Sequence, residues 1–262
     1  MADRFVQEER HLWIADLGRD VWSCLTFLPD SRASHPVWSP DNRRILFAAG
    51  APANLHWKES SGAGTEQRIA QSPNRQWSTD WSRDGRFILY YELSPDTQRD
   101  IWILPINPDG TPETAKARPY FRTRSNESMG KFSPEPSPRW VAYRSDESGL
   151  NEIVIQAFPE PHGKWQVSTG GGDFPEWSPD GRELFYVSPD RRLMAVSLQF
   201  SGDSVQPSTP RELFRLPEDD TPASTYAVAP DGKRFLVRAA TDQDSKLLEV
   251  IVNWPALLKS GK

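Results

Sequence analysis

An eleven-residue pattern recurs along the chain and restricts the folds open to it. It reads "VWSPDNRRILF" from Val37, "DWSRDGRFILY" from Asp80 and "EWSPDGRELFY" from Glu176. Weaker copies read "KFSPEPSPRWVAY" from Lys131 and "AVAPDGKRFLV" from Ala227. The marker residues, which recur at intervals of 43, 51, 45 and 51 residues, are Trp38, Trp81, Phe132, Trp177 and Val228. A period of about 40 to 50 residues is typical of propellers and of other repeat architectures.

Each copy predicts a tight turn between two strands. In "WSPDG" the proline presets φ, the aspartate bonds to nearby backbone, and the glycine adopts a positive φ without steric cost. The segment that follows, such as "RFILYYE", is rich in residues that favour strands. The turn aspartates are predicted to be structural, because residues repeated once per unit are distributed around a molecule and do not converge on a cation. They are Asp41, Asp84, Asp180 and Asp231.

Two further strands fit into each period. The third strands are predicted in "NLHWKES", "DIWILPI", "NEIVIQAF" and "RLMAVSL", and the short last strands in "EQRIAQ", "RPYFRT", "KWQVST" and "RELFRL". Apart from the brief tail "WPALLKS", no segment of twelve residues sustains a helical period. The sequence therefore predicts an all-β protein, a β-propeller of four-stranded antiparallel blades that occupies residues 1–262 as a single domain.

The two ends of the chain leave the number of blades open. The N-terminal segment, which contains "DVWSCLTF", supplies later strands without a first strand, whereas the C-terminal repeat has no clear last strand. If the two partial sets stay apart, the propeller has six blade positions. If "DVWSCLTF" completes the last blade, the ring closes with five. We favour six positions, in which the propeller domain lacks an N-terminal blade segment.

Composition excludes several classes of function. The net charge is −5 and no run of lysine and arginine stands out, so nucleic acid is not expected as a partner. Cys24 is the only cysteine, which leaves no internal disulfide and no cysteine-based metal site. Neither a signal peptide nor a stretch long enough to span a bilayer is present, so no membrane insertion is expected and the chain as written is predicted to be cytoplasmic.

Motifs for catalysis are absent from the sequence. There is no kinase catalytic loop, no Asp-Phe-Gly and no G-x-S-x-G elbow. The glycine cluster "TGGGD" at Thr169 lies between strands and is predicted to be a loop between blades. The four histidines, His11, His35, His56 and His162, form no metal-binding pair. We therefore expect a protein that is not an enzyme and that has no cofactor and no metal.

The quoted segments carry a family resemblance that covers nearly the whole chain. The repeated "WSPDGR" followed by an apolar strand resembles the TolB-like, WD-repeat-like propeller repeat. The order of "TDWSRDGRFILYYE", "DIWILP", "GKWQVSTGGGDFPEWSPDGRELFYVSPD" and "VNWPALLK" resembles the C-terminal propeller region of bacterial, acidobacterial-type serine/threonine protein kinases. "SPEPSPRW" departs from the Asp-Gly turn in the third unit, and Asn42 replaces glycine in the first.

That resemblance implies an interaction or sensory module that binds a protein, peptide or glycan on one propeller face. It also leaves two alternatives: an accessory fragment of a serine/threonine kinase or of a prolyl-oligopeptidase-like peptidase, or a metal-dependent sugar-acid lyase. As part of a longer membrane-anchored protein, the propeller would lie in the periplasm or outside the cytoplasm.

Candidate binding residues come from the innermost strands and from the loops that enter them. The residues before the markers form a row of mixed charge, Val37, Asp80, Lys131, Glu176 and Ala227, in which ion pairs between blades are the simplest expectation. The predicted binding set is Asp80, Lys131, Glu176, Arg75, Arg124, Asp173 and Tyr226. The repeated tryptophans Trp38, Trp81 and Trp177 are predicted to lie between blades. For the tryptophans outside that register, packing in the core is also favoured, and a stacking site for sugar or peptide is the alternative. These tryptophans are Trp57, Trp77, Trp102, Trp140 and Trp165.

Overall fold

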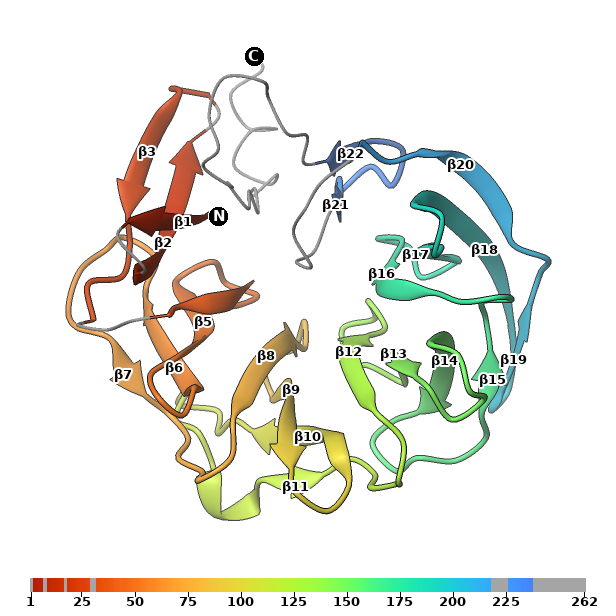
Figure 1. Ribbon diagram of the computed structural model, residues 1–262, viewed down its shortest axis with the longest axis horizontal. Helices are drawn as coiled ribbons and strands as arrows, with labels where there is room; N and C mark the ends of the chain where they lie inside the picture. Colours follow the sequence, from red (N-terminus) through yellow and green to blue (C-terminus); the bar gives the residue numbers. More distant parts are fainter. Residues whose placement is uncertain (1, 7–8, 17, 29–31, 218–225, 238–262) are drawn as a thin grey trace.

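Six antiparallel sheets are arranged around a common centre in the computed structural model (Figure 1). The structure describes residues 2–6, 9–16, 18–28, 32–217 and 226–237. Within these ranges the only helix is the 3-10 turn η1 (Thr114–Lys116), and no helix there is long and apolar enough to cross a membrane. The prediction of an all-β propeller is confirmed.

The three central sheets each follow the predicted four-strand order. The second sheet contains β4 (Ser34–Trp38), β5 (Arg44–Ala49), β6 (Asn54–Glu59) and β7 (Gln67–Arg68). The third contains β8 (Gln76–Trp81), β9 (Phe87–Ser94), β10 (Gln98–Pro105) and β11 (Arg118–Pro119). The fourth contains β12 (Glu127–Phe132), β13 (Trp140–Ser145), β14 (Glu152–Ala157) and β15 (Trp165–Gln166). The marker residue ends the first strand of each sheet, and β8 and β12 lie nearest the centre (Figure 1).

The fifth sheet has one strand more than the sequence predicted. It contains β16 (Asp173–Trp177), β17 (Glu183–Val187), β18 (Arg192–Ser201), β19 (Ser204–Pro207) and β20 (Arg211–Arg215). β18 continues beyond its pairing with β17, and its extension forms a hairpin with β19 through a turn at Gly202, where φ is +58°. The expected last strand is β20, which pairs with β18.

The terminal sheets bear on the number of blades. β1 (Ala2–Val6), β2 (Glu9–Asp16) and β3 (Val21–Cys24) form a sheet of their own, and β21 (Tyr226–Val228) pairs with β22 (Phe235–Val237). Within the described ranges the sheet β1-β2-β3 shares no strand pairing with β21 and β22, which favours six blade positions over the five-blade alternative. The predicted strand "LLEVIVNW" and the tail "WPALLKS" lie outside the described residues.

A repeated hydrogen bond identifies which strands the first sheet supplies. The amide of Leu25 donates to the carbonyl of Leu12, as Ile69 does to Leu55 in the second sheet. β2 and β3 therefore correspond to the third and fourth strands of a complete blade. The position of the first strand is not filled by any described residue.

The core lies between neighbouring sheets. Trp177 packs with Trp140 and Ile155 of the fourth sheet, and Trp81 stacks on Trp57 of the second sheet with ring centroids 5.9 Å apart. This confirms the predicted place of the repeated tryptophans between blades, where Trp38 also packs against the cluster shared by the first two sheets.

The tryptophans outside that register have different environments. Trp57 and Trp140 are buried, so for these two the stacking site is wrong. Trp102 and Trp165 pack at the edges of the same clusters. Trp77 is partly exposed and stacks on Tyr91, with ring centroids 5.0 Å apart.

The turn aspartates bind their own turns, as predicted. The hydroxyl of Ser39 donates to Asp41, and the same contact joins Ser82 to Asp84 and Ser178 to Asp180, at 2.6 to 2.7 Å. In each case the aspartate also accepts a hydrogen bond from the backbone amide two residues further on.

The glycine cluster closes a connection between two blades. The amide of Gly171 donates to the carboxylate of Glu152 at 3.0 Å, and a Cβ on Gly172 would lie 2.8 Å from the Cβ of Ser168. Tight packing explains the glycine at position 172.

Candidate functional site

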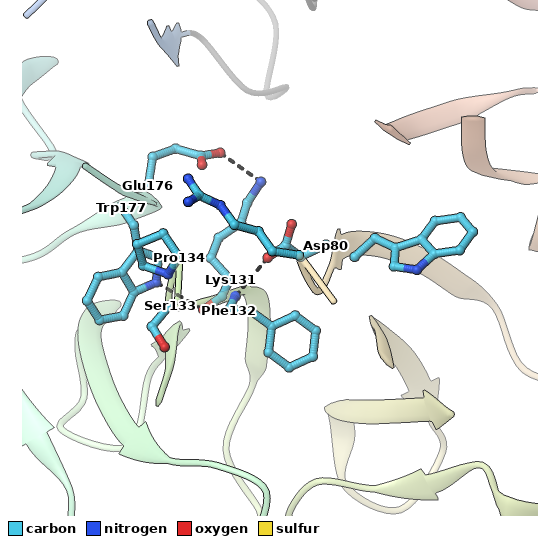
Figure 2. A pocket seen from close by; sticks show the side chains of 9 residues that line it. Asp80, Lys131, Phe132, Ser133, Pro134, Glu176 and Trp177 are labelled. Atoms are coloured by element: carbon cyan, nitrogen blue, oxygen red, sulfur yellow. Dashed lines mark hydrogen bonds and ion pairs between the residues drawn. The ribbon is translucent and has the colours of Figure 1, made fainter. Parts of the chain in front are cut away.

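Three charged residues from consecutive inner strands converge at the end of the propeller that carries the hairpin turns. Asp80 of β8, Lys131 of β12 and Glu176 of β16 each precede the marker residue of their repeat. They line a pocket of about 150 Å³ and their side chains point toward one another (Figure 2). The remaining lining residues are Trp81, Arg83, Phe132, Ser133, Pro134 and Trp177.

Lys131 is paired with Glu176 and also lies in the electrostatic field of Asp80. Its Nζ lies 2.7 Å from Oε1 of Glu176, and about a quarter of each side chain is exposed. Burial acts to lower the pKa of Lys131, but the carboxylates of Glu176 and Asp80 outweigh it, so the pKa is raised. The ammonium group therefore stays charged and ties β12 to β16.

Asp80 is partly buried beneath this ion pair. Its Oδ2 accepts a hydrogen bond from the backbone amide of Phe132 at 2.7 Å. Burial raises the pKa of Asp80 to about 6, while Lys131 and that amide act in the opposite direction. The carboxyl group consequently changes its charge close to neutral pH.

The aromatic walls of the pocket are held by backbone contacts. Nε1 of Trp177 donates to the carbonyl of Lys131 at 3.1 Å, across the boundary between the fourth and fifth sheets. Nε1 of Trp81 donates to the carbonyl of Gly85 at 3.1 Å. Because both indoles are also packed in the core, the pocket has fixed walls, and the groups at its mouth are the more adjustable part.

Arg83 is a lining residue that the sequence reasoning missed. It lies in the turn between β8 and β9, is exposed, and its Nη2 donates to the carbonyl of Pro179 at 3.4 Å. A signal was present in the sequence, because Arg83 stands where "WSPDG" has its proline.

The other four predicted residues are not in this pocket. Arg75 directly precedes β8, Arg124 lies before β12, and Asp173 and Tyr226 are the first residues of β16 and β21. Since a strand rises about 3.3 Å per residue, the two ends of β8 lie about 17 Å apart. These four residues therefore belong to the opposite end of the inner strands.

At that opposite end the predicted residues have separate contacts. Asp173 pairs with Arg144 at 2.6 Å, and the hydroxyl of Tyr226 donates to the carbonyl of Phe174 at 2.7 Å. Arg75 and Arg124 are exposed. The predicted set is thus divided between the two ends of the inner strands, and its role in binding stays a prediction.

The described ranges contain no group of three histidine, cysteine, aspartate or glutamate side chains that could hold a metal ion. What the pocket offers chemically is one ion pair, one carboxyl group with a raised pKa and one exposed guanidinium, between aromatic walls.

Comparisons with known proteins place the fold. No protein-family profile matches the chain. An uncharacterized protein, Atu1656 of Agrobacterium fabrum, is 25% identical over 165 residues, which make up 57% of this chain and 53% of that protein. The chain thus spans about half the length of the curated relative it matches.

Three solved structures share the architecture at low sequence identity. TolB from Acinetobacter baumannii matches with a TM-score of 0.68 and 14% identity, over 94% of this chain and 59% of TolB. The periplasmic gluconolactonase PpgL of Pseudomonas aeruginosa has a TM-score of 0.60 and 14% identity, over 90% of this chain and 75% of its own. An oligogalacturonate lyase in complex with manganese has a TM-score of 0.60 and 13% identity, over 92% and 67%. The chain therefore has a TolB-like β-propeller fold, which these relatives share whether or not they are enzymes.

Proposed function

We propose that the protein is a non-catalytic binding module, and that it holds a segment of a protein or peptide partner at the turn-bearing end of the propeller. The observation that carries the proposal is the convergence of Asp80, Lys131 and Glu176 on one pocket from three different blades. These charges also join neighbouring blades, but they do so at the wall of a pocket that a partner's side chain can enter. Loops and strand ends of a rigid propeller are where partners usually dock.

The size of the pocket favours one inserted side chain. Sites for whole small molecules usually measure about 300 to 1,000 Å³, whereas this one measures about 150 Å³. A peptide could insert one residue here and spread the rest of its contacts over the surrounding turns. A glycan, the other ligand class favoured by the sequence, would have to use the same turns with less insertion.

The charged groups of the pocket support binding over catalysis. Glu176 and Lys131 already neutralise each other at 2.7 Å, and Oδ2 of Asp80 accepts a hydrogen bond from the amide of Phe132. A general acid or base needs to reach its substrate directly. As an accessory part of a larger kinase or peptidase, the chain would use the same pocket for binding. The described ranges hold no cluster of metal-binding side chains, so no observation there favours the sugar-acid lyase as a second function.

A selection experiment with a pocket-blocking variant tests this proposal. A phage-displayed library of random twelve-residue peptides would be selected on the full chain, and the enriched peptides measured against Pro134→Trp. The equivalent turn position in the third sheet carries Arg83, so a long side chain already occurs at this position in one repeat. Pro40→Trp is the matched control, because Pro40 has the same place in its own turn and does not line the pocket.

We expect peptides whose dissociation constant rises at least about tenfold with Pro134→Trp and stays the same with Pro40→Trp. If no peptide is enriched, or if both variants bind like the original chain, the binding proposal is wrong. Turnover of a gluconolactone or of oligogalacturonate with manganese that disappears in Glu176→Gln would contradict the non-catalytic part.

A further inference from the structure

One turn departs from the internal repeat at the place where it borders the pocket. The second residue after the marker is a proline in four of the five repeats, and in the remaining repeat it is Arg83. The prolines have a packing role: a Cβ added to Gly181 would lie 3.2 Å from Cγ of Pro134, and one added to Gly232 would lie 3.2 Å from Cδ of Pro179. Arg83 therefore replaces a residue of the scaffold with a charged one.

The position of Arg83 places its guanidinium over the pocket. The side chain starts in the turn of the third sheet and reaches the carbonyl of Pro179 in the turn of the fifth. It lines the same pocket as Ser133 and Pro134, which lie in the turn of the fourth sheet. The bond is long, at 3.4 Å, and the residue is exposed. Among the described residues no carboxylate lies within ion-pair distance of it.

The other charges of the pocket already have partners. Lys131 is paired with Glu176 and lies close to Asp80, whose carboxylate accepts the amide of Phe132. Arg83 is thus the charged group of the pocket that can exchange its present contact at the lowest cost. A guanidinium binds a carboxylate through two parallel hydrogen bonds, a geometry that a lysine does not offer.

We propose that Arg83 recognises an acidic side chain of the bound peptide, an aspartate or a glutamate. This inference rests on the proposed function, because it names the chemistry of the residue that enters the same pocket. The carboxylate displaces the carbonyl of Pro179 from Arg83, and the apolar part of the inserted side chain lies beside Trp177 and Pro134. A basic side chain would instead meet Arg83 at the mouth and compete with Lys131 for its two carboxylates.

The pocket also sets the sign of a pH dependence. Asp80 faces Lys131 of β12 and Glu176 of β16. Arg83 lies in the turn that follows Asp80 in the same blade and lines the same pocket. When Asp80 gains a proton as the pH falls below about 6, one of the two negative charges near the incoming carboxylate disappears. The acidic side chain of the peptide remains ionised at pH 5.5, since its ordinary pKa is about 4. Binding should therefore be tighter at pH 5.5 than at pH 7.5.

The test uses the peptides selected from the random library on the full chain. We expect aspartate or glutamate to be enriched at one peptide position, and a change of that residue to asparagine or glutamine to weaken binding. Arg83→Gln should raise the dissociation constant of the acidic peptide about tenfold and remove the preference for acid over amide. The dissociation constant of Arg83→Lys should lie between that of the original chain and that of Arg83→Gln. Arg86→Gln is the matched control, because Arg86 is exposed in the same turn and does not line the pocket.

The outcomes separate this inference from the function on which it rests. Peptides that are lost with Pro134→Trp but bind equally to Arg83→Gln, or that are enriched in lysine and arginine, overturn the inference and leave the binding module standing. If no selected peptide depends on Pro134, the pocket is not the binding site, and both proposals fail.

Discussion

The carboxylate of Asp80 accepts a hydrogen bond from the backbone amide of Phe132, 52 residues further along the chain, and so joins β8 to β12. The bond crosses the boundary between two blades at the edge of the pocket. It makes a titratable group part of the contact between blades, so the stability of the fold becomes linked to the charge of the site.

Asp80→Asn tests that linkage. Because the pKa of Asp80 is raised to about 6 in the folded chain, its proton is held more tightly there than in the unfolded chain, where the pKa is about 3.9. The resulting stabilisation is complete below pH 3.9 and is lost as the pH rises through 6. The free energy of unfolding of the original chain, relative to that of Asp80→Asn, should therefore be higher at pH 4.5 than at pH 7.5, by about 2 kcal/mol.

Denaturant melts of both proteins at the two pH values measure this difference. A difference that stays constant, or that falls at the lower pH, would show that Asp80 is ionised as easily as an exposed aspartate.

The ion pair between Lys131 and Glu176 gives a second prediction. Lys131→Met leaves two partly buried carboxylates without their cation, and we expect a loss of about 2 kcal/mol, between the values for exposed and for buried pairs. Adding Glu176→Gln to Lys131→Met should recover part of that loss, because one of the unpaired charges is removed. A double-mutant cycle from thermal or denaturant melts yields the coupling. Strict additivity of the two changes would mean that the pair contributes nothing to stability.

Trp177→Ala should be among the most destabilising single changes in the chain. The indole is 8% exposed, and it packs against two sheets and donates to the carbonyl of Lys131. We expect a loss of about 3 to 5 kcal/mol in denaturant melts. Trp77→Ala serves as the comparison and should cost less, since Trp77 is partly exposed. A loss below about 1 kcal/mol for Trp177→Ala would contradict the assignment of the blades.

Deletion of residues 1–27 should lower the melting temperature and promote aggregation. Leu12 and Leu25 of the first sheet are buried against Ile45 and Phe47 of β5. Without them an apolar sheet face is exposed to water, and such a face is a site for association. Arg19→Ala, at an exposed position of the deleted segment, should leave melting and solubility unchanged. Equal melting and equal solubility of the deleted protein would show that the first sheet adds nothing to the fold.

The fold could be predicted because the same local chemistry is repeated. The serine, aspartate and glycine of each turn form short-range bonds that depend on a few adjacent residues, and the interval between turns gives the length of a blade. The strand β19 could not be predicted in this way, since it belongs to an insertion around Gly202 that occurs in one repeat.

Only part of the candidate site could be predicted from the sequence. Asp80, Lys131 and Glu176 share one register position, and identical positions in neighbouring blades come together around the centre. Arg75 and Tyr226 were grouped with them because sequence order shows that a residue lies near an inner strand without showing at which end. No role is predicted for Arg83 from the sequence, although a charged residue in place of a proline was itself the signal.

The outermost strands β7, β11 and β15 are only two residues long. A row of unpaired backbone groups invites another chain to add a strand, and very short rim strands remove that opportunity. The circumference at these three blades therefore offers little for sideways assembly into layers or fibres. The fifth sheet differs, since its β18 and β19 extend the rim. Crowding many copies together, as in a concentrated solution or on a surface, should bring neighbours into contact through the fifth blade in preference to these three blades.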